Sequence, residues 1–307
     1  MAVAQTPPNV DADAAARVKT RRRLSLRFAV LVIPAIGFLV VFFILPLAST
    51  VVVSLWRTES YEIIRDWNLD NYRVVLTQWT YVQFLLRSLA MAGVVSAICV
   101  VYAWPVAYFI AAHGGKVKLV LLLLTAAPFL TGIVLRVTAL QQILGPLGIV
   151  NMGWTRLGFE PIQALLYTDV STAIGLVYLW IPFMVLAIYL SLVNFDFELI
   201  EVAKVNGASP LRSFFEVVLP LNWMGTIIGI VLVFIPTLAE SVTAQFLGGV
   251  NGALFGNILA HQFGATGTWA LGAAMGVVLF VASLLAIGLM VRTVDLKRSG
   301  FTGKEQV

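Results

Sequence analysis

The chain has 307 residues, of which 60% are hydrophobic and 11% charged, with a formal net charge of +5. A soluble globular domain carries roughly 25% charged residues, so this composition excludes a soluble domain and indicates an integral membrane protein. A single cysteine, Cys99, excludes an internal disulfide framework.

The apolar segments predict an all-α membrane protein with six transmembrane helices, since a spanning helix needs about 20 mostly apolar residues. The first run is too long for a cleavable signal peptide, so we expect it to be retained. The uncharged region 241–291 is too long for one span, and its Gly-rich part, 248–268, is expected to form a loop or a re-entrant turn. The predicted spans are Phe28–Trp56, Ser88–Ala112, Leu119–Leu135, Val170–Phe195, Val217–Ala239 and Trp269–Val291.

The distribution of basic residues predicts the orientation of these spans. The N-terminal segment, the connections after the second and fourth spans and the C-terminal end together hold 14 of the 20 Lys and Arg residues. The connection at 58–70 instead holds four carboxylates and one arginine. The positive-inside rule therefore places both termini in the cytoplasm and accounts for the net charge without nucleic acid.

This topology predicts three parts. A cytoplasmic, disordered basic tail at 1–27 precedes a six-helix transmembrane domain at 28–293, and a cytoplasmic tail follows at 294–307. The charged connection at 196–220 is the longer of the two predicted cytoplasmic connections between spans and is the expected coupling loop.

The connection at 198–220, "ELIEVAKVNGASPLRSFFEVVLP", has the pattern of a helix, a break and a second helix. Glu201 and Lys204 are i,i+3 neighbours on one helical face. Asn206-Gly207 suits a helix end, and Ser209-Pro210 suits an N-cap followed by the first helical residue. Many cytoplasmic loops are short and amphipathic without a dedicated function, and composition alone leaves both interpretations open.

The spacing within this connection resembles a family signature. Glu201, Ala203 and Gly207, with Leu219-Pro220 beginning twelve residues after the glycine, are similar to the cytoplasmic motif of ABC importer permeases. That motif reads Glu-Ala-Ala, three residues, Gly, and about a dozen residues to Leu-Pro. This chain departs from it at Val202, where alanine is usual.

Three further stretches extend the resemblance over most of the chain. "NLDNYRVVLTQWTYVQFLLRSL" is similar to the segment entering the second span in permeases of the spermidine/putrescine type. "APFLTGIVLRVTALQQILGPLGIVN" resembles their third span and the loop after it, and "VFIPTLAESVTAQFLGG" resembles the end of their fifth. The chain thus resembles a type I ABC importer permease of the polyamine group, in the bacterial inner membrane.

The resemblance implies that the connection at 196–220 docks on a cytoplasmic ATP-binding subunit. Glu201 is then expected to pair with a basic group of that subunit or with Arg212. A second, similar permease, an external solute-binding protein and membrane lipid are the other implied partners. The substrate is expected to be a polyamine, although an opine, an organophosphonate, a ferric ion or another small solute fits the same class. The expected coupling residues are Glu201, Val202, Ala203, Val205, Gly207, Ala208 and Arg212.

No motif in the sequence predicts an enzyme. The phosphate-binding pattern GxxxxGK[ST] is missing, because Gly114-Gly115-Lys116 has neither the upstream glycine nor the hydroxyl residue. ATP must then be hydrolysed by partner subunits. The isolated His113 and His261 have no metal-ligand spacing, so we expect no catalytic residue, no metal and no cofactor.

Ionisable residues at membrane depth are costly and often functional. Glu240, after Pro236 in the fifth span, is a candidate to attract a cationic substrate or to form a gate with Arg136. Trp104 and Tyr178 could line a cation path, although aromatic residues also serve in packing and at membrane interfaces. Arg87 and Asp169 are interpreted as interfacial anchors.

Rival classes fit the sequence less well. A secondary transporter would show more spans and paired half-repeats, and an intramembrane hydrolase would need a nucleophile with a base or a metal set. A membrane scaffold would not need the hairpin pattern at 198–220.

Overall fold

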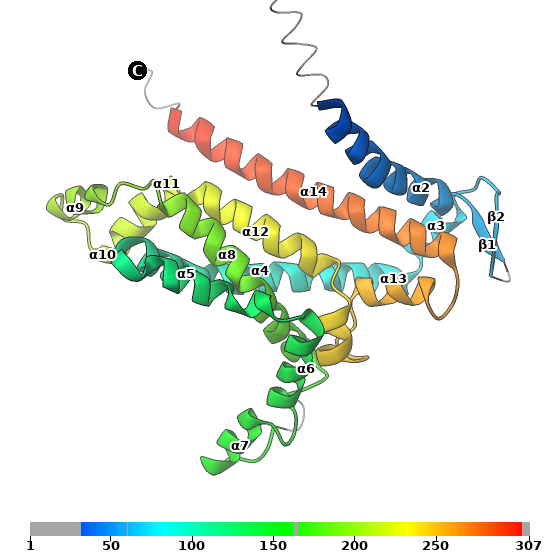
Figure 1. Cartoon of the computed structure of the whole chain (residues 1–307), viewed down its shortest axis with the longest axis horizontal. Coiled ribbons are helices and arrows are strands. Elements are labelled where there is room, and N and C mark those ends of the chain that lie inside the picture. Colours follow the sequence, from blue (N-terminus) through cyan, green and yellow to red (C-terminus); the bar gives the residue numbers. More distant parts are fainter. Residues whose placement is uncertain (1–31, 60, 163–164, 303–307) are drawn as a thin grey trace, which may run out of the picture. The chain divides into compact units, whose positions relative to one another are not determined.

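The computed structural model describes residues 32–59, 61–162 and 165–302. Contacts divide the chain into two units, residues 1–53 and 54–307. Most of the described residues are helical, and the strands among them form one short hairpin (Figure 1). The predicted all-α membrane architecture is therefore confirmed. Five helices in these ranges are long and apolar enough to cross a membrane, and one bent helix pair makes a sixth candidate.

The first unit holds most of the helix Val32–Ser54. This helix is π-helical over η1 (Val40–Ile44) and continues as α2 (Leu45–Ser54). The π-helical stretch ends two residues before Pro46, whose ring crowds the carbonyl four residues earlier and which has no N–H to donate. A wider turn accommodates such a residue. The predicted tail at 1–27 and the start of the predicted first span lie outside the described residues.

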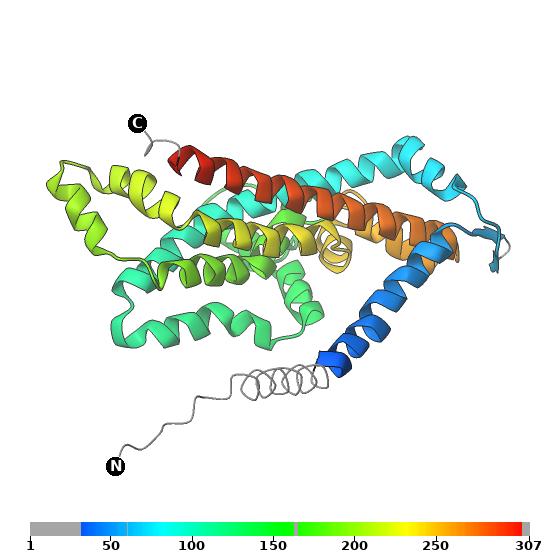
Figure 2. The same ribbon diagram turned by 90° about the horizontal axis from the view of Figure 1, so that it is seen from above.

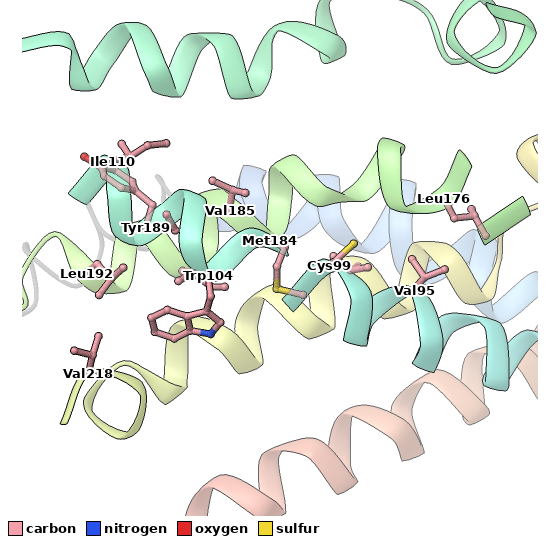
Figure 3. Close-up of a cluster of buried hydrophobic side chains, with 14 of the residues drawn as sticks. Val95, Cys99, Trp104, Ile110, Leu176, Met184, Val185, Tyr189, Leu192 and Val218 are labelled. Atoms are coloured by element: carbon pink, nitrogen blue, oxygen red, sulfur yellow. The ribbon is translucent and has the colours of Figure 1, made fainter. Parts of the chain in front are cut away.

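Three helices form the centre of the second unit, each packed against the other two: α4 (Trp79–His113), α8 (Asp169–Leu192) and α12 (Trp223–Leu238) (Figures 1 and 2). Gly225 and Gly229 let α12 approach α8 closely, because a Cβ at either position would clash with Ser191 or Met184 of α8. Small residues four apart commonly serve this purpose in membranes. Figure 3 shows the apolar core between these helices, which includes Val95, Cys99, Trp104, Leu176, Met184, Tyr189, Leu192 and Val218.

A second core joins α14 (Trp269–Thr302) to α3 (Asp70–Thr77), α12 and α13 (Phe255–Phe263). The strands β1 (Arg57–Glu59) and β2 (Glu62–Ile64) pair antiparallel beside the start of α14. There the hydroxyl of Thr58 accepts a hydrogen bond from the backbone N–H of Ala270 at 3.0 Å. The predicted start of the sixth span at Trp269 is confirmed, and the helix continues into the predicted C-terminal tail. Residues packed in this second core include Val75, Phe234, Leu238, Phe255 and Met275.

The predicted bounds of the third span, Leu119–Leu135, are wrong. The structure breaks this segment into α5 (Lys118–Ala126), a 3-10 turn at Ala127–Leu130 and α6, which begins at Ile133. Pro128 cannot donate a backbone hydrogen bond, and Gly132 has extended backbone angles, so the helix is interrupted between them. The run that meets the criteria for a membrane-crossing helix is Ile133–Arg156, made of α6 (Ile133–Leu144) and α7 (Ile149–Arg156).

The predicted fifth span, Val217–Ala239, bends at its beginning. A π-helical stretch, η4 (Phe214–Val218), leads into the short α11 (Leu219–Leu221), and α12 follows after Asn222. The axis of the helical run Pro210–Leu221 and that of α12 meet at 71°. Asn222 donates both its backbone N–H and its side-chain amide to the carbonyl of Val218, at 3.1 and 2.9 Å, so this residue closes the turn that precedes α12.

The Gly-rich segment predicted as a loop or re-entrant turn contains both a turn and a short helix. The π-helical stretch η5 (Ala244–Gly248) ends at Gly249, whose φ of +56° lies in the left-handed region. The chain then turns into α13, which packs against α4 and α14. This segment therefore belongs to the packed body of the second unit.

Candidate functional site

The charged connection folds as the predicted helix, break and helix. The first helix, α9 (Glu198–Val205), is followed by Gly207 with a φ of +85°, a conformation that glycine adopts without a steric penalty. Ser209 then caps α10 (Pro210–Ser213), since its hydroxyl accepts a hydrogen bond from the backbone N–H of Arg212 at 3.3 Å. We call residues 198–213 the α9–α10 hairpin.

The charged side chains of this region pair locally. Lys204 Nζ donates to Glu201 Oε1 at 2.7 Å, which confirms the predicted i,i+3 pair. Arg212 pairs with Glu216 instead of Glu201, and its Nε lies 2.9 Å from both carboxylate oxygens of Glu216. The Glu201 side chain remains 70% exposed, so its carboxylate is accessible to a second cation.

Apolar side chains also project from the α9–α10 hairpin. Val205 is 88% exposed, and Leu211 and Val202 are 72% and 57% exposed. Apolar groups displayed together beside charged ones are common at protein interaction sites. Of the residues expected to couple, Glu201, Val202, Val205, Gly207 and Arg212 are exposed, and Ala203 and Ala208 are half-buried.

The opposite side of this region is fixed to the helical core. The rings of Phe197 and Tyr108 meet edge to face at 6.0 Å, and those of Phe214 and Trp104 do so at 5.2 Å. Ile200, in the middle of α9, is buried. Aromatic pairs of this geometry add stability beyond the area that they bury. A displacement of the hairpin would therefore press directly on α4, which carries both Tyr108 and Trp104.

Glu240 lies at the joint between α12 and the segment before α13, and it is 8% exposed. Its Oε1 accepts a hydrogen bond from the backbone N–H of Thr243 at 3.0 Å, as in a helix N-cap. Asn257 donates to the carbonyl of Ser241 at 2.7 Å, and Gly256 lies so close that a Cβ there would be 2.6 Å from the carbonyl oxygen of Glu240. The carboxylate thus caps the first turn of the helical segment that leads into η5, directly after the end of α12.

Arg136, in α6, has an unusual environment. Its Nε and Nη1 are buried and have no hydrogen-bond partner within the described ranges. The guanidinium lies over the ring of Phe129, 5.2 Å from the centroid, where a cation–π contact offsets part of its desolvation. No hydrogen bond or ion pair joins Arg136 to Glu240 in the part of the chain that the structure describes, so their gate stays a prediction.

The two candidate aromatic residues differ in exposure. Trp104 is 4% exposed and belongs to the central core, while Tyr178 of α8 is 36% exposed. An apolar pocket of about 470 Å³ beside Trp104 is also lined by Phe214, Leu219 and Thr226. The surroundings of Trp104 favour the packing interpretation.

Sequence reasoning missed one connection. Arg87, interpreted as an interfacial anchor, donates through Nη2 to Asp169 Oδ1 and to the carbonyl of Asn251. The guanidinium thereby ties α4 to the first turn of α8 and to the Gly-rich segment. The sequence did hold a signal for this ion pair. Arg87 and Asp169 have opposite charges, and they precede the second and fourth predicted spans on the same predicted side of the membrane.

Comparison with known proteins identifies the family. No family model matches the chain. The spermidine/putrescine transport system permease protein PotB of Escherichia coli (strain K12) is 33% identical over 263 residues, covering 85% of this chain and 94% of that protein. The chain belongs to the PotB family of permeases. The inner membrane ABC transporter permease protein YdcU of the same organism is 25% identical to this PotB-family chain, covering 86% of it and 88% of YdcU.

Solved structures agree on the fold. A bacterial ABC transporter involved in the import of the acidic polysaccharide alginate has a TM-score of 0.68 at 12% identity, covering 91% of this chain and 98% of that one. The alginate transporter in complex with an alginate pentasaccharide-bound periplasmic protein has a TM-score of 0.67 at 14% identity, covering 89% of this chain and 94% of that one. The MetNI methionine ABC transporter has a TM-score of 0.52 at 19% identity, covering 72% of this chain and 96% of that one. This PotB-family chain is a multi-pass inner-membrane protein with the ABC importer permease fold.

Proposed function

We propose that this PotB-family permease forms half of the translocation pathway of an ATP-driven importer of polyamines such as spermidine and putrescine. The observation that carries the proposal is the 33% identity to a spermidine/putrescine permease across 85% of the chain. The expected cargo carries several ammonium groups, so a carboxylate along the path would lower the cost of its desolvation. Glu240 is our candidate for that carboxylate.

The chain acts within a larger assembly in this proposal. Two cytoplasmic subunits hydrolyse ATP, a second and similar permease completes the pathway, and a periplasmic solute-binding protein delivers the polyamine. Support comes from the sequence, which has no phosphate-binding loop of its own, and from the periplasmic protein bound to the alginate transporter. Both termini face the cytoplasm, as the basic residues near the spans predict.

The α9–α10 hairpin is the proposed contact with the ATP-binding subunit. Its exposed valines enter an apolar surface of that subunit, and Glu201 meets one of its cations. The aromatic pairs Phe197–Tyr108 and Phe214–Trp104 then pass the movement of the hairpin to α4. Tight packing carries such displacements because a filled core cannot absorb them locally.

Near the opposite end of α12, Glu240 and Arg136 are the proposed pathway residues. Glu240 Oε2 makes no hydrogen bond within the described ranges, while Oε1 is held by Thr243. The free oxygen is the atom that we assign to an ammonium group of the cargo. Arg136 competes for the same carboxylate when the pathway is empty.

Uptake of radiolabelled putrescine and spermidine by cells that carry the complete transporter tests this proposal. Glu201→Lys should abolish ATP-dependent uptake, because it reverses the charge offered to the ATP-binding subunit. Glu198→Lys is the matched control, since it makes the same change in the same helix outside the family motif, and it should transport normally. An assembled, ATP-hydrolysing wild-type complex without polyamine uptake would remove the proposed substrate. Normal uptake by Glu201→Lys would remove the coupling role.

A further inference from the structure

A groove of about 500 Å³ lies between α4 and α5. Its walls are apolar and include Pro105, Val106 and Phe109 of α4 with Leu121 and Leu124 of α5. The one hydroxyl in its lining, that of Thr125, donates to the carbonyl of its own helix at Leu121, 2.9 Å away. The groove has the volume of a small-molecule site, roughly 300–1,000 Å³, and its side chains offer hydrocarbon contacts only.

Basic residues lie at one end of this groove. The helix α4 ends at His113, and α5 begins at Lys118, at the end of the bundle that also carries the α9–α10 hairpin (Figures 1 and 2). The ring of His113 stacks on Phe109, a wall of the groove, with 5.8 Å between centroids. Lys116 is exposed in the connection, and Lys118 Nζ lies 5.1 Å from the centroid of the Tyr189 ring.

These lysines have no acidic partner in their vicinity along the sequence. The chain contains no Asp or Glu between Asp70 and Glu160. Lys118 stands one helical turn before Leu121 of the groove lining, and Lys116 stands two residues before Lys118. No described residue forms an ion pair with either of these cations.

We propose that the groove between α4 and α5 binds an anionic phospholipid. An acyl chain lies between Val106 and Leu124, and the phosphate is held by Lys116 and Lys118. Basic pockets between transmembrane helices are suited to acidic headgroups, and each lysine near the surface adds a favourable Coulombic attraction. An apolar helix of a partner protein would fill the groove equally well, but it would leave both lysines without an anion.

The lipid would stabilise the junction from which α5 departs. Lys118 already contacts Tyr189 of α8 through its ammonium group, and a phosphate beside it would fix the connection of α4 to α5 against the end of α8. The ring of His113, directly before this connection, lies 6.5 Å from that of Tyr108, which also packs on Phe197 before α9. The bound lipid thus supports the part of α4 that receives the hairpin.

Native mass spectrometry of the transporter, released from nanodiscs of equal parts dioleoylphosphatidylglycerol and dioleoylphosphatidylcholine, tests the proposal. The wild type should retain phosphatidylglycerol in preference to phosphatidylcholine. Lys116→Gln and Lys118→Gln should each weaken that preference about fivefold, and the double variant about 25-fold, as expected for surface lysines. Arg156→Gln, which removes one cation from the end of α7, is the matched control and should leave the preference unchanged.

A second variant separates the groove from the charges. Val106→Trp fills the groove without changing any cation, and it should reduce retained phosphatidylglycerol as strongly as the loss of a lysine. The proposal is overturned if the double lysine variant keeps the wild-type preference, or if Arg156→Gln loses as much. It is also overturned if the wild-type complex retains no lipid, or if Leu124→Cys forms a disulfide with a cysteine in the other permease.

Discussion

The guanidinium of Arg87 in α4 binds the carboxylate of Asp169, which stands 82 residues later in the sequence and opens α8. The same nitrogen also binds the backbone carbonyl of Asn251. The Arg87 side chain is 29% exposed and that of Asp169 is 56% exposed, so water screens part of their attraction. Because of the additional bond to Asn251, the Arg87 side chain contacts two other segments, whereas the bond to Arg87 links Asp169 to one.

Arg87→Gln should therefore destabilise the chain more than Asp169→Asn. The first change removes both bonds of the guanidinium, whereas the second leaves the bond to Asn251 in place. We expect losses of about 1–2 kcal/mol and about 0.5 kcal/mol in the free energy of unfolding, after discounting for screening. Denaturation of the purified protein in detergent measures both. Equal losses in the two variants would show that the bond to Asn251 contributes nothing.

Gly207 offers a test of backbone geometry. Its φ of +85° would strain any L-residue, yet a Cβ at this position meets nothing within 4 Å. Gly207→Ala therefore changes conformational strain alone, at a cost of roughly 1–2 kcal/mol to the hairpin. We expect weaker association with the ATP-binding subunit and lower uptake.

Co-purification of that subunit measures the effect of Gly207→Ala. The matched control is Gly93→Ala in α4, where a Cβ also meets nothing within 4 Å and no positive φ is present; alanine suits a helix interior, and assembly should be normal. Gly207→Asn should recover part of the association, because asparagine tolerates left-handed backbone angles. Full association of Gly207→Ala would refute the need for this conformation.

Much of the fold followed from elementary patterns, and the hairpin is the clearest case. Each part of the hairpin was predicted from neighbouring residues alone. The spacing of Glu201 and Lys204 predicted α9, Gly207 predicted the break, and Ser209-Pro210 predicted the start of α10. The bounds of the third span failed because Pro128 and Gly132 both lie inside an uninterrupted apolar run. Hydropathy continues through such residues, whereas backbone hydrogen bonding does not.

The candidate site was less predictable wherever it depends on distant residues. Arg87, Asp169 and Asn251 meet only because α4, α8 and the Gly-rich segment pack together. Likewise, the sequence around Glu240 did not reveal that its carboxylate caps the backbone N–H of Thr243. Such contacts arise from tertiary packing, which local patterns do not specify.

Glu240→Gln separates the structural role of this residue from its charge. Glutamine keeps a side-chain oxygen that can accept the hydrogen bond from Thr243, so the chain should fold and assemble normally. If the charge attracts the cargo, polyamine uptake at low concentration should fall at least tenfold, which corresponds to about 1.4 kcal/mol. Glu240→Leu, which loses both functions, should also destabilise the protein. Unchanged uptake by Glu240→Gln would assign the residue to capping alone.

Arg136 offers a test of whether a buried guanidinium takes part in transport. Its Nε and Nη1 are buried without hydrogen-bond partners among the described residues, and such a group costs stability unless something else pairs with it. Arg136→Met removes the buried charge together with its cation–π contact, and its apolar side chain can still pack against Phe129. The isolated chain should therefore be as stable as the wild type or more stable. If Glu240 or another acceptor binds Arg136 during transport, uptake should nevertheless fall. Thermal denaturation and uptake are measured on the same variant to separate a structural role from a role in transport. A less stable chain would show that the guanidinium already has a structural role. A stable chain with normal uptake would exclude Arg136 from the pathway.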